Sequence, residues 1–492
     1  MPERGPDGGA LQGREYGVLL HATSLPGATE YGALGRAADH FLDWLNVAGA
    51  GVWQLLPLGP VGDDGSPYFA RSTHAGNPRL IDLEELARAG WLTLAARGDE
   101  PFAPWHARQV QRAAQTMLAT APGARAAFDA WVSAEAYWLE DYALATVLRS
   151  RAGNTPWWTW APELRDRQPA ALAKARADYA DECALVSAEQ YFFHRQWRAL
   201  HERAAARGVR LFGDMPIYLA PDAVDVWAHR ELFQLDAAGR PTAVAGVPPD
   251  YFAVDGQLWG NPLYRWEVHE ATGFRWWLER LAADLKLCDF VRIDHFRALE
   301  AYWSVPAGST ARVGTWCLAP GDALLRAARV RFGRLPVVAE DLGVITTEVE
   351  ALRDAHGLPG MRVLQFGFDG NPANPHLPHN WHPDLVAYSG THDNDTLCGW
   401  LRSLDEGTRA SVAQYVGSDD LPAALLRWLF GSVPRLVVLP MQDLLGLGAE
   451  ARMNTPGTVV GNWSWMLHWD QVPASLAART RELAARYGRV AG

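Results

Sequence analysis

Length, composition and charge exclude several classes of protein. The chain has 492 residues and a formal net charge of −11 at pH 7, which argues against binding to nucleic acid or to an anionic membrane surface. No stretch reaches the roughly 18 apolar residues of a membrane helix, and residues 1–14 are polar, so we expect neither a membrane span nor a signal peptide.

The cysteines indicate the compartment. Four are present and lie far apart, without a CxxC pair or any metal-ligand spacing: Cys183, Cys288, Cys317 and Cys398. We therefore expect free thiols in a reducing compartment and a cytoplasmic protein. The chain also has 23 tryptophans, which can pack cores or stack on sugar rings. Trp227 and Trp266 are assigned to core packing.

Apolar segments of strand length alternate with helical patterns along the chain. The expected strands are 16–21, 51–58, 208–217, 289–296, 336–340, 361–366, 385–388 and 435–440. The expected helices between them are 33–48, 266–286, 321–331, 346–356, 405–416 and 422–429. This order predicts an α/β fold, a (β/α)8 barrel. A doubly wound open sheet is the alternative, but no Gly-rich dinucleotide fingerprint follows the first strand.

Two insertions interrupt the alternation at the predicted C-terminal face of the barrel. Residues 66–208, between strands two and three, are mostly helical and too long for an ordinary loop. Residues 219–287, between strands three and four, include an irregular stretch rich in Pro, Gly and Asp, which indicates a substrate loop. We expect residues 1–492 to form one catalytic barrel domain without a C-terminal β-sandwich.

The fourth expected strand carries charge on one face. Successive side chains of a strand point to opposite sides, so Val291 and Ile293 should pack under helices while Arg292 and Asp294 point to the centre. A neighbouring guanidinium favours the ionised carboxylate and lowers its pKa, as a nucleophilic carboxylate requires. A buried structural Arg–Asp pair is the alternative.

Carboxylates lie at or after the C-terminal ends of three expected strands: Asp294 on the fourth, Glu340 on the fifth and Asp393 after the seventh. In a parallel barrel these ends meet at one mouth, and two opposed carboxyls are what glycosidic bond cleavage requires. Asp294 beside Arg292 fits the ionised role. Burial and the adjacent Asp341 should raise the pKa of Glu340, which fits the acid that later acts as a base. A metal site is disfavoured because no ligand cluster accompanies these acids.

The motifs around these acids resemble those of a known family. VRIDHF, AEDLG and GTHDND, in this order, resemble motifs of the α-amylase superfamily, and more closely those of the amylomaltase or 4-α-glucanotransferase (disproportionating enzyme) family. LLHATSLPG, SPYFARSTHAGNP, GDMPIYLAPDAVDVWA, GVPPDYFAVDGQLWGNPLYRW, GLPGMRVLQFGF, NPHLPHN and ARMNTPGTVVGNWSW extend the resemblance over residues 17–465.

The resemblance implies roles for individual residues. Asp294 matches the nucleophile, Glu340 the acid/base, and Asp393 the third acid, which grips sugar hydroxyls. Matches to substrate-binding residues are Ser66, Tyr68, Asp214, Tyr251, Phe252, Gln257, Trp259, Arg292, His295, His392 and Asn462. Tyr68 and Trp259 have core packing as an alternative, Asp214 a structural partnership with Arg292, and Asn462 a turn-forming role.

The implied activity is 4-α-glucan transfer between malto-oligosaccharides by a retaining double displacement, with the Asp294 and Glu340 carboxyls about 5–5.5 Å apart. An α-1,4-glucan hydrolase and a catalytically inert glucan-binding protein are the alternatives. The chemistry is carried by carboxyls, so no cofactor and no metal are expected. Donor and acceptor glucans are the expected partners, and the chain is expected to be a monomer or a small homo-oligomer.

Overall fold

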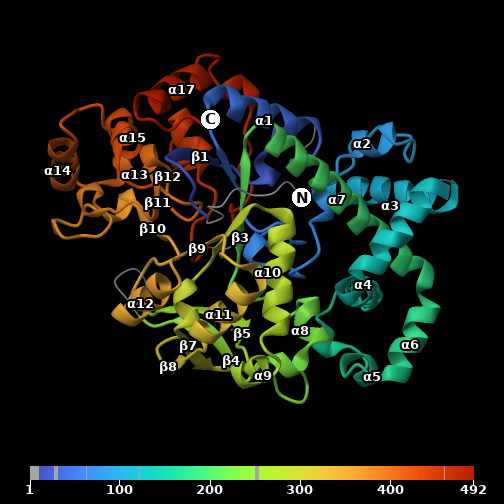
Figure 1. Ribbon diagram of the computed structural model, residues 1–492. Coiled ribbons are helices and arrows are strands. Elements are labelled where there is room, and N and C mark those ends of the chain that lie inside the picture. The colour runs from blue at the N-terminus through green and yellow to red at the C-terminus, as the bar shows by residue number, and fades with distance from the viewer. Residues whose placement is uncertain are drawn as a thin grey trace.

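Eight parallel strands form a barrel at the centre of the molecule (Figure 1). The computed structural model describes residues 10–26, 31–62, 64–120, 122–249, 254–458 and 460–491. The barrel strands are β1 (Glu15–Leu19), β2 (Val52–Gln54), β3 (Arg210–Met215), β6 (Phe290–Ile293), β9 (Val337–Ala339), β10 (Gly360–Val363), β11 (Leu385–Tyr388) and β12 (Leu436–Pro440). Neighbouring strands follow the order β10-β11-β12-β1-β2-β3-β6-β9. The predicted (β/α)8 barrel is therefore confirmed.

The seam between β9 and β10 is closed by hydrogen bonds around one buried carboxylate. Ala339 N donates to Pro359 O at 2.8 Å, next to the start of β10. Asp341 accepts from Met361 N at 2.6 Å and from the guanidinium groups of Arg353 and Arg362. A buried carboxylate is stabilised only when its lone pairs find such donors. Asp341 thus fixes the strand end from which Glu340 projects.

Each barrel strand contributes to two buried layers, as the period of two requires. Side chains inside the barrel form one apolar cluster, including Phe212, Phe290, Val338, Val386 and Leu436. Their sequence neighbours pack under the helices, including Leu211, Val291, Ile293, Val337 and Ala339. The predicted orientation of Val291 and Ile293 is thus confirmed. On β6 the interior positions become charged toward the C-terminal end.

Helices surround the barrel in chain order (Figure 1). They are α1 (Arg36–Ala48), α7 (Ala180–Ala206), α10 (Arg275–Leu287), α11 (Gly321–Phe332), α12 (Thr347–Ala355), α13 (Leu397–Ser403), α14 (Glu406–Val416), α15 (Leu421–Gly431), α16 (Met441–Leu445) and α17 (Leu476–Arg486). The helix predicted over 266–286 is divided into α9 (Trp266–Ala271) and α10, because the chain turns at Gly273 with φ 63°. Trp227 and Trp266 are buried, as predicted.

Helices fill the segment between β2 and β3. This region lies at the right of Figure 1 and contains α2 (Leu83–Arg88), α3 (Phe102–Thr120), α4 (Pro122–Arg151), α5 (Pro162–Arg165) and α6 (Pro169–Asp178) before α7. Within the described ranges, no helix combines the length and apolar composition needed to cross a bilayer.

A second sheet, which the sequence patterns did not reveal, lies beside the barrel at the bottom of Figure 1. It consists of β4 (Ala243–Val247), β5 (Gln257–Pro262), β7 (Ala301–Pro306) and β8 (Thr315–Leu318), antiparallel in the order β5-β4-β7-β8. The short helix α8 (Val224–Ala228) precedes β4. Because β4 and β5 follow β3 and the other two strands follow β6, this sheet is tied to the strand ends that carry the acids.

Candidate active site

The charged end of β6 lies in a compact cluster with β3. Strand pairing sets Arg292 opposite Asp214. Arg292 Nε donates to Asp214 Oδ1 at 3.0 Å, and Nη2 donates to Asp294 Oδ1 at 2.7 Å. The Tyr68 hydroxyl donates to Asp214 Oδ2 at 2.7 Å and accepts from Arg292 Nη2 at 3.3 Å. One guanidinium therefore bridges two carboxylates, a geometry suited to the planar fork of arginine.

Burial changes the expected electrostatics of Asp294. Burial raises the pKa of this carboxyl, Arg292 lowers it, and the charges of Asp214 and Asp393 raise it further, so that the net shift is upward. The predicted lowering of this pKa by the Arg292 cation is therefore present, but it does not decide the net shift. The contact with Arg292 is present, but the loss of solvation in the barrel mouth outweighs it.

Glu340 stands beside Asp294 on the adjacent strand. Ile293 pairs with Ala339, so the two acids follow the last paired residues of β6 and β9. Backbone amides hold the Glu340 carboxyl: His295 N donates to Oε2 at 2.6 Å and Leu342 N to Oε1 at 2.8 Å. These contacts bring the two acids to neighbouring positions in the barrel mouth.

The geometry around Glu340 has a local cause. His295 has φ 50°, in the left-handed region, which turns its N–H toward the carboxyl of the next strand. Burial is the main reason that the pKa of Glu340 is raised well above its ordinary value, and the charge of Asp294 adds to it. The predicted upward shift is thus present, but the expected neighbour was wrong: Asp341 is engaged by Arg353 and Arg362 instead.

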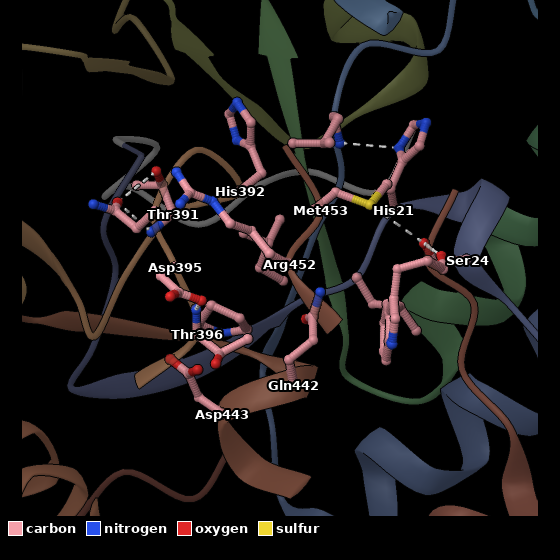
Figure 2. Close-up of a pocket in the computed structure, with 16 residues that line it drawn as sticks. His21, Ser24, Thr391, His392, Asp395, Thr396, Gln442, Asp443, Arg452 and Met453 are labelled. Atoms are coloured by element: carbon pink, nitrogen blue, oxygen red, sulfur yellow. Dashed lines mark hydrogen bonds between the residues drawn. The ribbon is translucent and has the colours of Figure 1, made fainter. Parts of the chain in front are cut away.

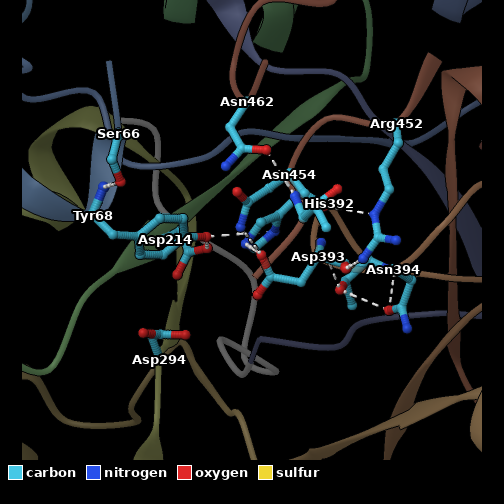
Figure 3. Close-up of polar contacts among 12 residues, drawn as sticks. Ser66, Tyr68, Asp214, Asp294, His392, Asp393, Asn394, Arg452, Asn454 and Asn462 are labelled. Carbon is cyan, nitrogen blue, oxygen red and sulfur yellow. Dashed lines mark hydrogen bonds and ion pairs between the residues drawn. The ribbon is translucent and has the colours of Figure 1, made fainter. Parts of the chain in front are cut away.

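Asp393 reaches the mouth from the loop after β11. Its side chain is 48% exposed, in contrast to Asp214, whose side chain has no exposed area. The Asp393 Oδ1 atom lies 3.3 Å from His392 Nε2 and accepts from Asn454 Nδ2 at 2.6 Å (Figure 3). Burial acts to raise the pKa of Asp393, but His392 and Asn454 outweigh it and hold the pKa well below its usual range. The carboxylate therefore stays ionised.

Aromatic rings line the wall between Tyr68 and Asp393. Tyr68 stacks on His392 with ring centroids 5.0 Å apart, and Trp463 tilts toward both rings at 5.8 and 5.9 Å. Ser66 supports this wall, because its hydroxyl accepts from Tyr68 N at 3.3 Å and caps the 3-10 turn Pro67–Phe69. Both Ser66 and Tyr68 are half-buried, so Tyr68 is not completely buried in the core.

The opposite wall comes from β5 of the second sheet. The half-buried Trp259 meets the His295 ring edge-on, with centroids 4.7 Å apart. Its indole N–H donates to Gln257 Oε1 at 3.0 Å, and Gln257 itself is exposed. Tyr251 and Phe252, predicted at the tip of the same loop, lie outside the described residues.

The side-chain amide of Asn462 forms hydrogen bonds within its own loop. Its Oδ1 accepts from Thr455 N at 2.9 Å, and its Nδ2 donates to Thr458 O at 2.9 Å. These bonds favour the turn-forming alternative. Figure 3 nevertheless shows the side chain on the same side of the mouth as His392 and Asp393.

Residues that the sequence reasoning did not single out surround a cavity of about 20 Å³ beside His392 (Figure 2). His21, at the end of β1, accepts from Leu56 N at 3.3 Å through Nδ1. Burial, aided by His392, lowers the pKa of His21 to about 3. The cavity is large enough for about one water molecule. Ser24, Gln442 and Arg452 also line it. The motifs LLHATSLPG and ARMNT contain three of these residues and were the available signal.

The described residues contain no group of three or more His, Cys, Asp and Glu side chains arranged to hold a metal ion. The groups that contact the acids at this mouth include backbone amides, the Arg292 guanidinium, the Tyr68 hydroxyl, the His392 ring and the Asn454 carboxamide. Such donors stabilise carboxylates in defined protonation states. The arrangement is suited to proton transfer and to attack by a carboxylate on an electrophilic carbon.

Comparison with known proteins identifies one family over most of the chain. The family model described as 4-alpha-glucanotransferase matches residues 20–472. The chain is 48% identical over 494 residues to a 4-alpha-glucanotransferase of Thermus thermophilus, covering 96% of this chain and 98% of the relative. It is 42% identical over 498 residues to one from Synechocystis sp., covering 97% and 99%. An amylomaltase from Streptococcus agalactiae, solved in complex with acarbose, matches with a TM-score of 0.94 at 35% identity, covering 97% of this chain and 100% of that one.

Proposed function

Because the chain belongs to the 4-alpha-glucanotransferase family, we propose that Asp294, Glu340 and Asp393 carry out glucan transfer between malto-oligosaccharides. The observation that carries this assignment is the pairing of β6 with β9, which sets Asp294 and Glu340 side by side, with His295 N bonded to the Glu340 carboxyl. Two carboxyls on neighbouring strands can serve the two sides of one glycosidic bond. The carboxyl separation of about 5–5.5 Å stays a prediction of this proposal.

In the first step, an Asp294 oxygen attacks the anomeric carbon of the donor glucan. The bond from that carbon to the leaving 4-oxygen breaks, and the leaving oxygen takes the proton of Glu340. Arg292 supports this step, because its bond to Asp294 Oδ1 leaves Oδ2 as the attacking atom. Asp294 contacts the guanidinium directly, whereas Glu340 is bound by neutral backbone amides, so Glu340 is the carboxyl that holds the proton.

In the second step, the 4-hydroxyl of an acceptor glucan attacks the same carbon. Glu340, now ionised, removes the hydroxyl proton, and the bond to Asp294 breaks. Two inversions give net retention of the anomeric configuration. Asp393 accepts hydrogen bonds from hydroxyls of the distorted sugar, which its low pKa permits at every step.

Binding is assigned to the two aromatic walls. Tyr68 and His392 present one flat wall, and Trp259 with Gln257 presents the opposite one toward the acceptor. Ser66, Asp214, Arg292 and His295 hold these groups or the acids in place. Tyr251, Phe252 and Asn462 are assigned to substrate binding from the family resemblance. From the family resemblance, the segment 247–264 is assigned to shielding the intermediate from water, which favours an acceptor sugar over hydrolysis.

The proposed setting is carbohydrate metabolism in the cytoplasm, with maltose- and starch-derived glucans as donors and acceptors and a monomer or small homo-oligomer as the working unit. Four cysteines without a disulfide support a reducing compartment.

Incubation with maltotriose tests the function. Transfer converts maltotriose to glucose and longer oligomers, while the total number of reducing ends stays constant. A steady rise in reducing ends would identify a hydrolase instead. Unchanged maltotriose, with binding retained, would identify an inert glucan-binding protein.

A further inference from the structure

Two segments far apart in the chain are joined above the barrel mouth. The loop after β11 carries His392 and Asp393, and residues 452–454 follow α16. Asn454 N donates to His392 O at 3.1 Å, and Arg452 Nη2 donates to Asp393 O at 2.6 Å. Arg452 Nε also donates to Asn454 O at 2.7 Å, so this guanidinium ties both backbones together. The backbone of the third acid is therefore fixed by the 452–454 segment (Figure 3).

The Asn454 side chain acts on the carboxylate itself. Its Nδ2 donates to Asp393 Oδ1 at 2.6 Å, and His392 Nε2 lies 3.3 Å from the same oxygen. Neither of these two partners bonds Oδ2, which Figure 3 shows on the Asp294 side of the carboxylate. One oxygen is thus held while the other faces the mouth. A carboxylate that must accept hydrogen bonds from a sugar needs this division between its oxygens.

The Asn454 carboxamide, which donates to Asp393 Oδ1, carries no charge. Arg292 neutralises much of the charge of Asp214 and Asp294, whereas a carboxamide orients a carboxylate without adding positive charge. The charged and titratable groups that interact with Asp393 include His392, Arg292, Asp294 and Tyr68. The Asn454 carboxamide therefore orients Oδ1 without adding positive charge, while His392 is the main cause of the lowered pKa of Asp393.

The loop does not need the Asn454 amide for its own folding. Asn462 holds Thr455 N at 2.9 Å, and Trp463 N donates to Met453 O at 2.7 Å across the loop. The Met453 side chain is buried. These bonds close the loop independently, so the Asn454 carboxamide is available for Asp393 alone.

We propose that Asn454 is a positioning residue for the reaction: its carboxamide holds Oδ1 of Asp393 so that Oδ2 meets the sugar hydroxyls, and Arg452 fixes the backbone that makes this contact possible. The proposal rests on the function proposed above, because it assigns a purpose to the orientation of the third acid. It adds a residue that acts on the reaction through Asp393.

The test compares Asn454→Ala and Asn454→Asp with the parent enzyme in maltotriose disproportionation. Loss of one hydrogen bond to a charged group predicts a decrease of about 10- to 100-fold in kcat for Asn454→Ala. The KM should stay unchanged, because the interaction matters in the transition state. Asn454→Asp keeps the shape but opposes two carboxylates, so its activity at neutral pH should be lower still.

A pH profile separates positioning from general damage to the loop. As the pH falls, the carboxyl introduced by Asn454→Asp gains a proton and can again donate to Asp393. The activity ratio of this variant to the parent should therefore rise toward acidic pH, whereas the ratio for Asn454→Ala should stay flat. The melting temperature of Asn454→Ala should stay close to that of the parent.

Ser464→Ala is the matched control. The exposed Ser464 hydroxyl donates to Gly461 O at 3.1 Å within the same loop and is not among the partners of Asp393, so kcat should be unaffected. Parental kcat in both Asn454 variants would overturn the proposal, and so would an equal loss in Ser464→Ala. A parent enzyme that fails to disproportionate maltotriose would instead overturn the proposed function, so the two failures are distinguishable.

Discussion

The barrel mouth presents its acids in two different ways. Asp294 and Glu340 project from paired strands, and Asp294 is bound to a buried guanidinium. Asp393 projects from a loop, is half exposed, and is bound by a carboxamide from a distant segment. The pKa is raised for both strand-borne acids and lowered for the loop-borne acid.

This difference separates two physical tasks. Acids that exchange a proton or form a bond must be close together, and strand register gives that proximity at little conformational cost. Close proximity and burial then couple their protonation, so one carboxyl holds a proton while the other is ionised. An acid that only stabilises charge has to stay ionised, and for Asp393 the His392 ring and the Asn454 carboxamide achieve this. The following predictions probe this division.

The largest effect is expected at the attacking carboxylate. Asp294→Asn removes the nucleophile while keeping its shape and its hydrogen-bonding capacity toward Arg292. Transfer activity should fall by at least about 10⁴-fold, as for other covalent nucleophiles. Malto-oligosaccharide binding, measured by calorimetry, should persist. Substantial residual turnover would assign the nucleophile to another residue.

The free energy of unfolding should depend on the buried ion pairs of Arg292 more than on an ion pair at the surface. Arg292→Met leaves Asp214 buried without its cation, which predicts destabilisation by about 3–5 kcal/mol in urea unfolding. Arg435→Met is the control, because it removes an ion pair to Asp384 in which both side chains are substantially exposed. That control should change the unfolding midpoint little. Equal losses in the two variants would contradict the view that the Arg292 cluster is held by charge compensation.

The pH dependence follows from the raised pKa values of the strand-borne acids. Asp294 must be ionised, so kcat/KM should rise as the pH passes above its pKa, and burial displaces this acidic limb upward. Glu340 must be protonated, so activity should fall as the pH passes its pKa, which lies well above that of an ordinary glutamate. Glu340→Gln, assayed for glycosylation with a glycosyl fluoride, should lose the alkaline limb. An alkaline limb that survives would belong to a different group.

The smallest effect is expected at the wall formed by Trp259 and Gln257. Trp259→Ala removes a flat ring next to His295 and should weaken acceptor use by about 2- to 10-fold, the worth of one aromatic contact. Transfer should be reduced relative to hydrolysis in product analysis by chromatography. Trp428→Ala, at an exposed position on α15, is the control and should leave the product ratio unchanged.

The sequence predicted the strand-borne part of the site better than the rest. Alternation around Arg292 and Asp294 is a local pattern, and parallel strands bring their carboxyl ends to one edge by geometry alone. The second sheet was missed because β4 and β5 lie in a stretch rich in Gly, Pro and Asp, and because β4 also pairs with the distant strand β7. Strand propensity there depends on those partners.

The contacts that tune the acids could not be obtained from local patterns. Asn454 lies 61 positions after Asp393, and only the folded barrel joins them. The left-handed backbone of His295 is likewise set by tertiary context, because its N–H is required by Glu340 on the next strand. The net pKa of Asp294 depends on how burial balances Arg292, which the sequence does not specify.

Covalent trapping tests most directly whether Asp294 and Glu340 divide the two steps between them. The Glu340→Gln variant is incubated with maltosyl fluoride, whose leaving group needs no acid, and is then analysed by intact mass and peptide mapping. One maltosyl unit should accumulate on Asp294, because no base remains to activate an acceptor hydroxyl. An adduct on another carboxylate would contradict this division of roles. Release of maltose with inverted anomeric configuration and no adduct would contradict it as well.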